Sequence, residues 1–498
     1  MNRIRNMKTN WMPFLCAALA LSAGGLPAAP AQPAASPNIV FILTDDQGWA
    51  DLNTPMDPNV PEGSSSFFST PAMSRLAAEG MRFPNGYASA PICTPTRRSI
   101  QFGMTPARQR GTDFVSDSFV PKNHLSIAQA LKRADPSYRC AHFGKWGEHM
   151  AGPWTPPPDY NPNSEAHPKY LGYDESDGLT GNLTGTQYFP SVYGKEKAKQ
   201  DVILNPDPDP KRTFSVTARA IAFMERQTAE KRPFYLQVSY YAIHLALQAR
   251  KETIAKYAAQ SPMNRQMLAG LAPMLDDLDA GVMQLLNAID RLGIKDKTYI
   301  FFSSDNGGSP EKAVGERKDL PQRNHPLARG KQTLYEGGIR VPFIVRGPGV
   351  KAGAVCREPV AQYDLLPTFY DLAGGREPLP ADVDGGSLQP LMENSGAVKR
   401  SLPALVFHRP GLASLPHSAI RSGDYKLVVQ WKGPWQVAKR ELFDLSRDIG
   451  ETNNLAEKMP EKADELAGIL ISYLKSVNAE AAPAPAAPKK KPAPKATP

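Results

Sequence analysis

Cysteine is scarce in this chain, with four residues among 498. So few cysteines exclude a fold that depends on a framework of disulfides. Cys16 lies in the N-terminal leader, and Cys140 lies in residues 138–143, a run typical of a buried strand, so we expect it to be an inert core thiol. A disulfide between Cys140 and Cys356 is the alternative. The fourth cysteine, Cys93, stands in a different context.

Long apolar runs are also missing. The apolar stretch 11–21 is too short and too interrupted to span a membrane, so the sequence predicts no transmembrane segment. Basic residues precede this stretch, and Ala29-Pro30-Ala31 follows it as a small-x-small cleavage site. Residues 1–31 are therefore predicted to be a signal peptide, which implies export to the periplasm or secretion.

The excess of positive charge is small once the two ends are set aside. The net charge is +9, of which the leader contributes three charges. The tail, residues 479–498, has four lysines against Glu480, which leaves +3 for the body. The basic pI is therefore no argument for a nucleic-acid partner. The tail lacks apolar residues to bury and is predicted to be disordered, either idle or in contact with an anionic surface.

Three short apolar runs predict strands that are covered on both faces, at residues 38–43, 234–239 and 298–303. Between the last two, residues 267–292 carry apolar side chains at helical spacing. Strands that alternate with helices predict an α/β fold with a large, mixed and mostly parallel sheet flanked by helices. In such folds ligands bind beyond the carboxyl ends of the strands.

The composition predicts two folded parts, a main domain at residues 36–400 and a smaller α+β subdomain at 401–478. Within the first, residues 155–210 are rich in Pro, Asn, Asp and Gly, which predicts a long surface insertion and a wall for a pocket. The second is expected to hold an antiparallel sheet and a helix, at residues 419–429, 440–445 and 461–477.

Two pairs of polar residues follow predicted strands. Asp45-Asp46 follows the first strand, and Asp305-Asn306 follows the third. Adjacent carboxylates repel each other unless they point apart or a cation lies between them. Three carboxylates and an amide oxygen suit Ca²⁺ or Mg²⁺ rather than Zn²⁺. Each pair taken alone could equally be a tight turn.

The stretch Cys93-Thr94-Pro95-Thr96-Arg97 has the pattern Cys-x-Pro-x-Arg. Thr94 is predicted to be the N-cap of a helix and Pro95 its first residue, so Cys93 would lie at a helix N-terminus, where anions are favoured. A partly buried cysteine in a turn is the plainer interpretation of so short a pattern.

Further motifs accompany these residues in a fixed order. With them, the chain resembles a type I, formylglycine-dependent sulfatase of the alkaline phosphatase superfamily from about residue 37 to 477, closest in look to bacterial carbohydrate sulfatases. In addition to the residues above, the resemblance rests on Asn38-Ile39-Val40, Gly144-Lys145-Trp146, Gly330-Lys331, Tyr335-Glu336-Gly337-Gly338, Asp364-Leu365-Leu366-Pro367-Thr368, Asp444-Leu445 and Glu451-Thr452-Asn453-Asn454-Leu455.

The resemblance implies that Cys93 is oxidised to formylglycine by a formylglycine-generating enzyme or its equivalent. One hydroxyl of the hydrated aldehyde would attack sulfur, and the second would later allow sulfate to leave. The family's metal site implies Ca²⁺, or Mg²⁺, as cofactor, held by residue 93 together with four polar side chains, namely Asp45, Asp46, Asp305 and Asn306.

The resemblance also implies four further catalytic residues. Arg97 would hold the diol and the metal-bound carboxylates, and Lys145 and Lys331 would neutralise the sulfate oxygens. Lys331 or His244 would protonate the leaving group. Without the resemblance, these basic side chains would be solvated surface charges and His244 a structural hydrogen-bonding residue.

The chain departs from the family at one position. Where sulfatases commonly have Gly-Lys-Trp-His, this chain has Gly147 in place of the histidine. His149, two residues later, is the candidate to replace it as a substrate-binding residue.

The resemblance predicts an exported sulfatase acting on sulfated carbohydrates, with galactose or N-acetylgalactosamine sulfates as the specific guess. An arylsulfatase, and a phosphonate or phosphate monoester hydrolase of the same superfamily, are the nearest alternatives. A non-catalytic protein that binds sulfated glycans is the alternative from another class.

Overall fold

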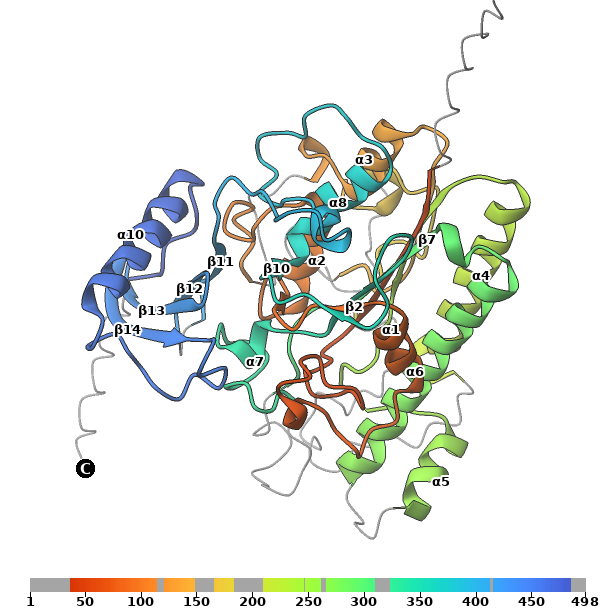
Figure 1. Cartoon of the computed structure of the whole chain (residues 1–498), viewed down its shortest axis with the longest axis horizontal. Coiled ribbons are helices and arrows are strands. Elements are labelled where there is room, and N and C mark those ends of the chain that lie inside the picture. Colours follow the sequence, from red (N-terminus) through yellow and green to blue (C-terminus); the bar gives the residue numbers. More distant parts are fainter. Residues whose placement is uncertain are drawn as a thin grey trace, which may run out of the picture. The chain divides into compact units, whose positions relative to one another are not determined.

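An eight-stranded sheet forms the centre of the protein in the computed structural model, which describes residues 36–113, 121–147, 165–182, 209–245, 247–260, 266–309, 323–412 and 415–484 (Figure 1). Five adjacent strands run parallel, β8 runs against them, and β2 and β9 restore the first direction. The order is β5 (Glu175–Ser176), β4 (Arg139–Gly144), β6 (Phe234–Ser239), β1 (Asn38–Thr44), β7 (Thr298–Ser304), β8 (Phe343–Arg346), β2 (Met81–Arg82) and β9 (Ala354–Val355). The prediction of a mixed, mostly parallel sheet is confirmed.

Helices cover both faces of this sheet, as the alternating side chains of β1 require. Val40 and Ile42 point into one apolar cluster, and Ile39, Phe41 and Leu43 point into another. Each such side chain stabilises the fold by roughly 1.5–3 kcal/mol when fully buried. The first cluster is completed by α1 (Pro71–Glu79), α4 (Thr213–Ala229) and α6 (Gln266–Arg291), and the second by α2 (Cys93–Phe102), α3 (Ile127–Ala134) and α8 (Leu365–Leu372) (Figure 1).

The main predicted elements agree with the observed ones. The three predicted strands correspond to β1, β6 and β7, and the helix predicted at 267–292 is α6. Smaller elements complete this part of the chain: α5 (Lys251–Gln260) packs on α6, α9 (Gln389–Met392) packs on α8, and β3 (Gly86–Tyr87) pairs with β10 (Val360–Ala361).

The predicted surface insertion at 155–210 is wrong for the part of it that the structure describes. Residues 165–182 include β5, which pairs in parallel with β4 and extends the sheet. Leu171 and Tyr173 are buried in the apolar cluster on the α2 side of the sheet. The sequence did not indicate this edge strand, because two residues are too few to show an alternating pattern and the surrounding residues are rich in Pro, Gly and Asn.

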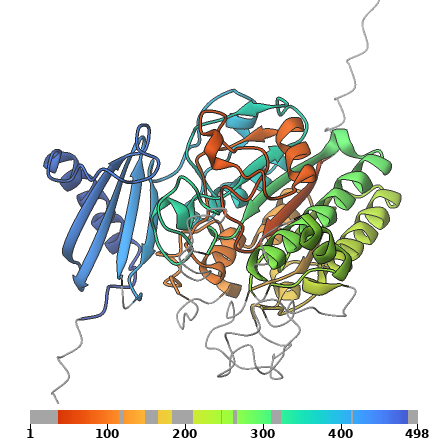
Figure 2. The same cartoon turned by 90° about the horizontal axis from the view of Figure 1, so that it is seen from below.

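A second, four-stranded antiparallel sheet follows in the chain, with α10 (Pro460–Ser476) packed on one face (Figure 2). Along β13 the side chains alternate, so that Leu427 and Val429 face α10 and Val428 faces the opposite way. That opposite face packs on Tyr87, Leu334 and other residues of the preceding chain. The strands are β11 (Leu405–Arg409), β12 (His417–Ser422), β13 (Tyr425–Gly433) and β14 (Gln436–Asp444). The C-terminal antiparallel sheet and helix are confirmed, while the division of domains at residues 400 and 401 stays a prediction.

The start of the predicted disordered tail needs correction. Ala479 and Ala482 are buried against the α10 side of the second sheet, and the Glu480 carboxylate accepts hydrogen bonds from Thr112. Small alanine side chains suffice here because the surface they cover is already apolar. The rest of the tail and the predicted signal peptide lie outside the described residues.

The sulfur atoms agree with a further expectation. Cys93, Cys140 and Cys356 are unpaired, and Cys140 is fully buried in β4, as an inert thiol would be. Within the described ranges, every helix is too short or too polar to cross a lipid bilayer.

Candidate active site

Four parallel strands bring the predicted site residues to one edge of the large sheet. Register pairs Thr44 with Ser304 and Leu43 with Ser239, and Gly144 also pairs with Ser239, so β1, β7, β6 and β4 end side by side. The next residues along these strands therefore emerge together. They include Asp45 after β1, Lys145 after β4 and Asp305 after β7, all fully buried.

The adjacent carboxylates of Asp45 and Asp46 turn to different partners. Asp46 has a left-handed backbone (φ 61°), a conformation that aspartate tolerates better than most residues. Lys145 Nζ lies 2.5 Å from Asp45 Oδ2, and Lys331 Nζ lies 2.6 Å from Asp46 Oδ1. The repulsion expected of adjacent acids is thus offset by two lysines from separate motifs.

Arg97 joins the third carboxylate to the cluster. It projects from α2, and its Nε donates to Asp305 Oδ2 at 2.9 Å while a terminal nitrogen donates to the Lys145 carbonyl at 2.6 Å. Asp305 Oδ1 in turn accepts the backbone N–H of Asp46 at 3.1 Å. Arg97 is only 2% exposed, so it is a buried structural part of the site rather than a solvated surface charge.

Burial and the neighbouring charges act on the acids in opposite directions. Burial raises the pKa of Asp45, but the charge of Lys145 acts in the opposite direction, and the result is a lowered pKa. Asp46 behaves likewise through Lys331. For Asp305, burial and the charge of Asp45 raise the pKa despite Arg97. The bases therefore stabilise the charged forms of Asp45 and Asp46, whereas the charged form of Asp305 is disfavoured.

Cys93 is the first residue of α2, which corrects the predicted cap. The helix begins at Cys93 with Ile92 as N-cap, two residues before the predicted N-cap Thr94 and first residue Pro95. The Thr96 hydroxyl bonds the preceding loop at Ala90. Cys93 is 2% exposed, and burial raises the pKa of its thiol although Lys145 and Lys331 act against this. An unmodified Cys93 would therefore be a neutral thiol and a poor nucleophile.

His244 lies at the rim of the cluster. Its Nδ1 donates to the Leu245 carbonyl at 2.7 Å, so Nε2 faces Asp46 Oδ2 at 4.0 Å. Burial and the charge of Lys331 lower the pKa of His244 to about 4. The neutral ring thus presents an unprotonated Nε2 toward the site.

The donor set fits a hard divalent cation. Asp45 Oδ1 and Asn306 Oδ1 are buried, and neither has a hydrogen-bond partner within the described part of the chain. Ligand atoms of Asp45, Asp46 and His244 lie within 4.8 Å of one another. Oxygen atoms of this kind suit Ca²⁺ or Mg²⁺. In the cluster three acids, Asp45, Asp46 and Asp305, face three bases, Arg97, Lys145 and Lys331, so a divalent cation would give the site the net positive charge that an anionic substrate requires.

One basic residue near the cluster carries no motif signal. Lys211, in the 3-10 helix Pro210–Arg212, is 3% exposed. Burial lowers its pKa to about 7, and the charges of Asp45 and Lys145 act on it as well. Its backbone is left-handed (φ 60°). In the sequence Lys211 stands at the end of the predicted insertion, where no motif indicated a role for it.

The predicted substitute for the missing histidine, His149, lies outside the described residues. Gly147 itself donates its N–H to the Thr180 carbonyl.

Gly144 controls how Lys145 leaves β4. Its φ is +95°, and a Cβ there would lie 1.9 Å from the Ser239 carbonyl oxygen. We therefore expect Gly144→Ala to lower the free energy of unfolding by more than the roughly 1–2 kcal/mol that a left-handed backbone alone costs an L-residue. Gly293→Ala is the matched control, because Gly293 has φ +65° and no atom within 4 Å of the added Cβ. Equilibrium urea unfolding compares the two, and equal losses would contradict the close contact.

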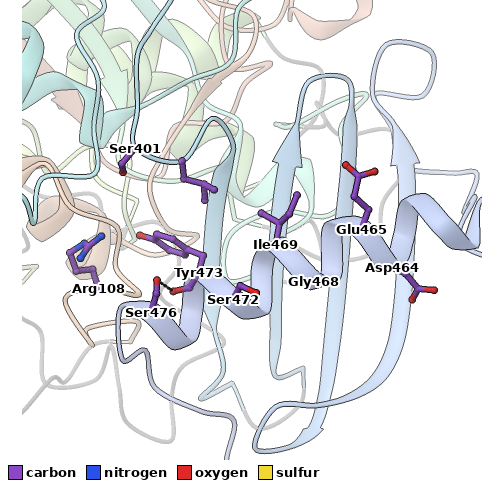
Figure 3. Close-up of a pocket in the computed structure, with 10 residues that line it drawn as sticks. Arg108, Ser401, Asp464, Glu465, Gly468, Ile469, Ser472, Tyr473 and Ser476 are labelled. Carbon is purple, nitrogen blue, oxygen red and sulfur yellow. Dashed lines mark hydrogen bonds between the residues drawn. The ribbon is translucent and has the colours of Figure 1, made fainter.

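A groove elsewhere on the protein is not the reaction site. It has a volume of about 750 Å³ and lies between α10 and the segments that carry Arg108 and Ser401 (Figure 3). Its charged groups already have partners, since Arg108 binds Asp384 and Glu465 binds Lys462. None of the motif residues lines it. The chemistry therefore belongs at the ends of the parallel strands.

Comparison with known families decides the identity of this site. The model of the family described as "Sulfatase" matches residues 37–375, which include every acid and base of the cluster. The chain belongs to the sulfatase family. A second family model, "N-sulphoglucosamine sulphohydrolase, C-terminal", matches residues 329–479 of this sulfatase.

Individual relatives agree with the family. Arylsulfatase A of Homo sapiens is 31% identical, over 88% of this chain and 85% of the relative. N-acetylgalactosamine-6-sulfatase of Mus musculus is 29% identical, over 84% and 76%. The crystal structure of Ps i-CgsB in complex with k-i-k-neocarrahexaose has a TM-score of 0.69 at 27% identity and covers 88% of this chain and 93% of that one. The predicted family, fold and enzyme class are confirmed, so this sulfatase is a sulfuric ester hydrolase.

Proposed function

We propose that this sulfatase is exported and hydrolyses sulfate esters of carbohydrates, with a formylglycine made from Cys93 and a calcium ion held by Asp45, Asp46, Asp305 and Asn306. The observation that carries the proposal is the convergence of the Cys93 end of α2 with two lysines and these oxygen donors at one sheet edge. Export rests on the leader sequence, residues 1–31, and maturation rests on a formylglycine-generating enzyme or its equivalent.

The modified residue and the cation supply what the side chains lack. Formylglycine supplies a hydrated aldehyde, with one hydroxyl to attack sulfur and a second that lets sulfate leave. A bound divalent cation supplies positive charge where negative charge develops. Residue 93 could itself be one of the cation's ligands, as the family pattern implies.

The remaining residues bind the sulfate group and move the proton. Lys145 and Lys331 already contact the acids at the sheet edge, and both are placed to neutralise sulfate oxygens when substrate enters. Arg97 fixes Asp305 and the Lys145 backbone, which keeps the donors in position. Lys331, whose ammonium contacts Asp46, would protonate the departing alcohol, whereas His244, which also faces Asp46, would do so only after its Nε2 had taken up a proton. His149 stays a candidate for the substrate contact that Gly147 cannot make.

The names of the relatives support a sugar substrate. One relative is named for N-acetylgalactosamine 6-sulfate, and the solved structure cited above contains an oligosaccharide. Sulfated galactose or N-acetylgalactosamine units are therefore the substrates that we propose to test first.

A substrate panel tests this proposal. We expect sulfate release from at least one sulfated galactose or N-acetylgalactosamine saccharide, with kcat/KM above that for p-nitrophenyl sulfate, because a sugar pocket adds binding energy away from the reacting bond. Ion chromatography of released sulfate measures it. Activity on the aryl ester alone would instead identify an arylsulfatase, and faster cleavage of phenyl phosphonate than of any sulfate ester would favour a phosphonate monoester hydrolase.

A binding protein without catalysis is the alternative from another class, and the glycine at position 147 is its motivation. Peptide mass spectrometry of protein from the native host separates the two. Cysteine that remains unmodified at position 93 in all molecules would favour binding over catalysis.

A further inference from the structure

The loop that carries Lys331 is held by every strand of the C-terminal sheet. Residues 332–336 connect Lys331 to the short helix α7 (Glu336–Ile339). Consecutive parts of this loop meet β11, β12, β14 and β13 in turn. The contacts are Arg409 to the Gln332 carbonyl at 2.7 Å, the Leu334 N–H to His417 Nε2 at 2.7 Å, the Tyr335 hydroxyl to Glu441 at 2.6 Å, and Lys426 Nζ to Glu336 Oε1 at 2.8 Å.

The contact made by Lys426 is the most deeply buried of the four. Lys426 and Glu336 are both fully buried, and the ammonium also lies 2.8 Å from Glu451 Oε1. Glu451 Oε2 accepts the backbone N–H of Glu336 at 2.7 Å, while Arg340 Nε and the Tyr87 hydroxyl donate to Glu336 Oε2. Such a network fixes its members tightly, because any member that moves would leave buried charge unpaired.

The loop that follows Asp305-Asn306 contacts both the turn that begins at Glu336 and Lys331. The Gly307 N–H donates to the Gly338 carbonyl at 3.0 Å, next to Asp305 and Asn306, and the Lys331 N–H donates to the Gly308 carbonyl at 2.9 Å. There is no free space at these contacts. A Cβ on Gly307 would lie 1.9 Å from the Gly337 oxygen, and one on Gly338 would lie 2.0 Å from the Thr333 oxygen. A shift of the turn would therefore shift the Asp305-Asn306 loop and Lys331 together.

We infer that Lys426 is a positioning residue for the sulfatase reaction: through Glu336 and Glu451 it sets the places of Lys331 and of the Asp305-Asn306 pair. It acts through these residues and touches no reacting atom. The C-terminal sheet is thus part of the catalytic apparatus, although every predicted catalytic side chain comes from the chain before it. The inference rests on the proposed roles of Lys331 and the metal ligands.

Amide hydrogen exchange in the Lys426→Met variant tests the inference without relying on activity. In the full-length protein we expect the amides of Gly307 and Lys331 to exchange hydrogen about tenfold faster or more, because their bonds depend on the turn. Amides within β13 should keep their protection. With the best sulfate ester, kcat should fall by about 10²-fold, the cost of a misplacement near 1 Å, with a smaller change in KM.

Two further variants separate positioning from general loss of stability. Lys426→Met combined with Glu451→Gln removes one unpaired carboxylate and restores folding if the single variant is unstable, yet it should keep the faster exchange at Gly307 and Lys331. Arg346→Met is the matched control, because Arg346 is 4% exposed and pairs with Glu79 at the opposite edge of the large sheet. It should leave both amides and kcat unchanged.

The outcomes are distinct. Wild-type exchange at Gly307 and Lys331 in the Lys426 variants, or equal acceleration in Arg346→Met, would overturn the positioning role. If wild-type protein hydrolysed no sulfate ester, the proposed function would fail, and the exchange measurement would still decide whether Lys426 orders the site.

Discussion

Cys93→Ala is expected to abolish sulfate ester hydrolysis while the protein remains folded. The substitution removes the side chain that we propose as the precursor of the nucleophile, and loss of a nucleophile costs on the order of 10⁴-fold or more in kcat. Little stability should be lost, because one sulfur atom is a small part of the packing around α2 and the Thr96 and Arg97 contacts are unchanged. Sulfate release and thermal unfolding measure the two effects.

Cys140→Ala is the matched control for this prediction. Cys140 is as deeply buried as Cys93 and is also unpaired, but it lies in β4 against the α3 side of the sheet. Its removal should leave kcat near the wild-type value. A Cys93→Ala protein that kept most of its activity would refute the nucleophile, whereas equal loss in both variants would indicate a general effect on the fold.

The sequence was most informative where a polar residue of the site directly follows an apolar strand. The apolar runs at β1, β6 and β7 predicted buried parallel strands, and parallel strands oblige Asp45 and Asp305 to emerge at one edge. The predicted proximity of these acids followed from topology alone. The lysine partners of these acids could not be predicted in this way. Nothing in the sequence around Lys145 and Lys331 distinguishes a buried ammonium from a surface charge, and only the family pattern indicated them.

The residues that the sequence could not reveal act through tertiary contacts. Lys426 looks like an ordinary lysine of an antiparallel strand, and its burial depends on Glu336 and Glu451, which lie far from it in the sequence. Lys211 has no recognisable spacing at all. The cap of α2 was misplaced because Thr94 is a good N-cap by residue type, whereas the helix begins two residues earlier than predicted, with Ile92 as its N-cap. Such choices depend on partners that are absent from the local sequence.

Removal of divalent cations is expected to inactivate the enzyme reversibly. A metal of this kind contributes several kcal/mol of transition-state stabilisation, so chelation should lower kcat by about 10³-fold or more, and added Ca²⁺ should restore it. Binding also stabilises the fold, by about 2.7 kcal/mol at a free cation concentration one hundred times Kd. Thermal unfolding at increasing Ca²⁺ therefore gives a readout that needs no substrate.

Asp305→Asn should remove most of that calcium-dependent stabilisation, because it replaces a carboxylate of the cluster by a neutral amide of the same shape. Asp279→Asn is its control. Asp279 is also a buried aspartate, but its carboxylate accepts the Ala72 and Met73 N–H groups at the start of α1, away from the strand ends. The control should retain the full calcium response. A calcium response that survived Asp305→Asn undiminished would exclude Asp305 as a ligand, and the metal would then have to be assigned to the remaining group, Asp45, Asp46 and His244.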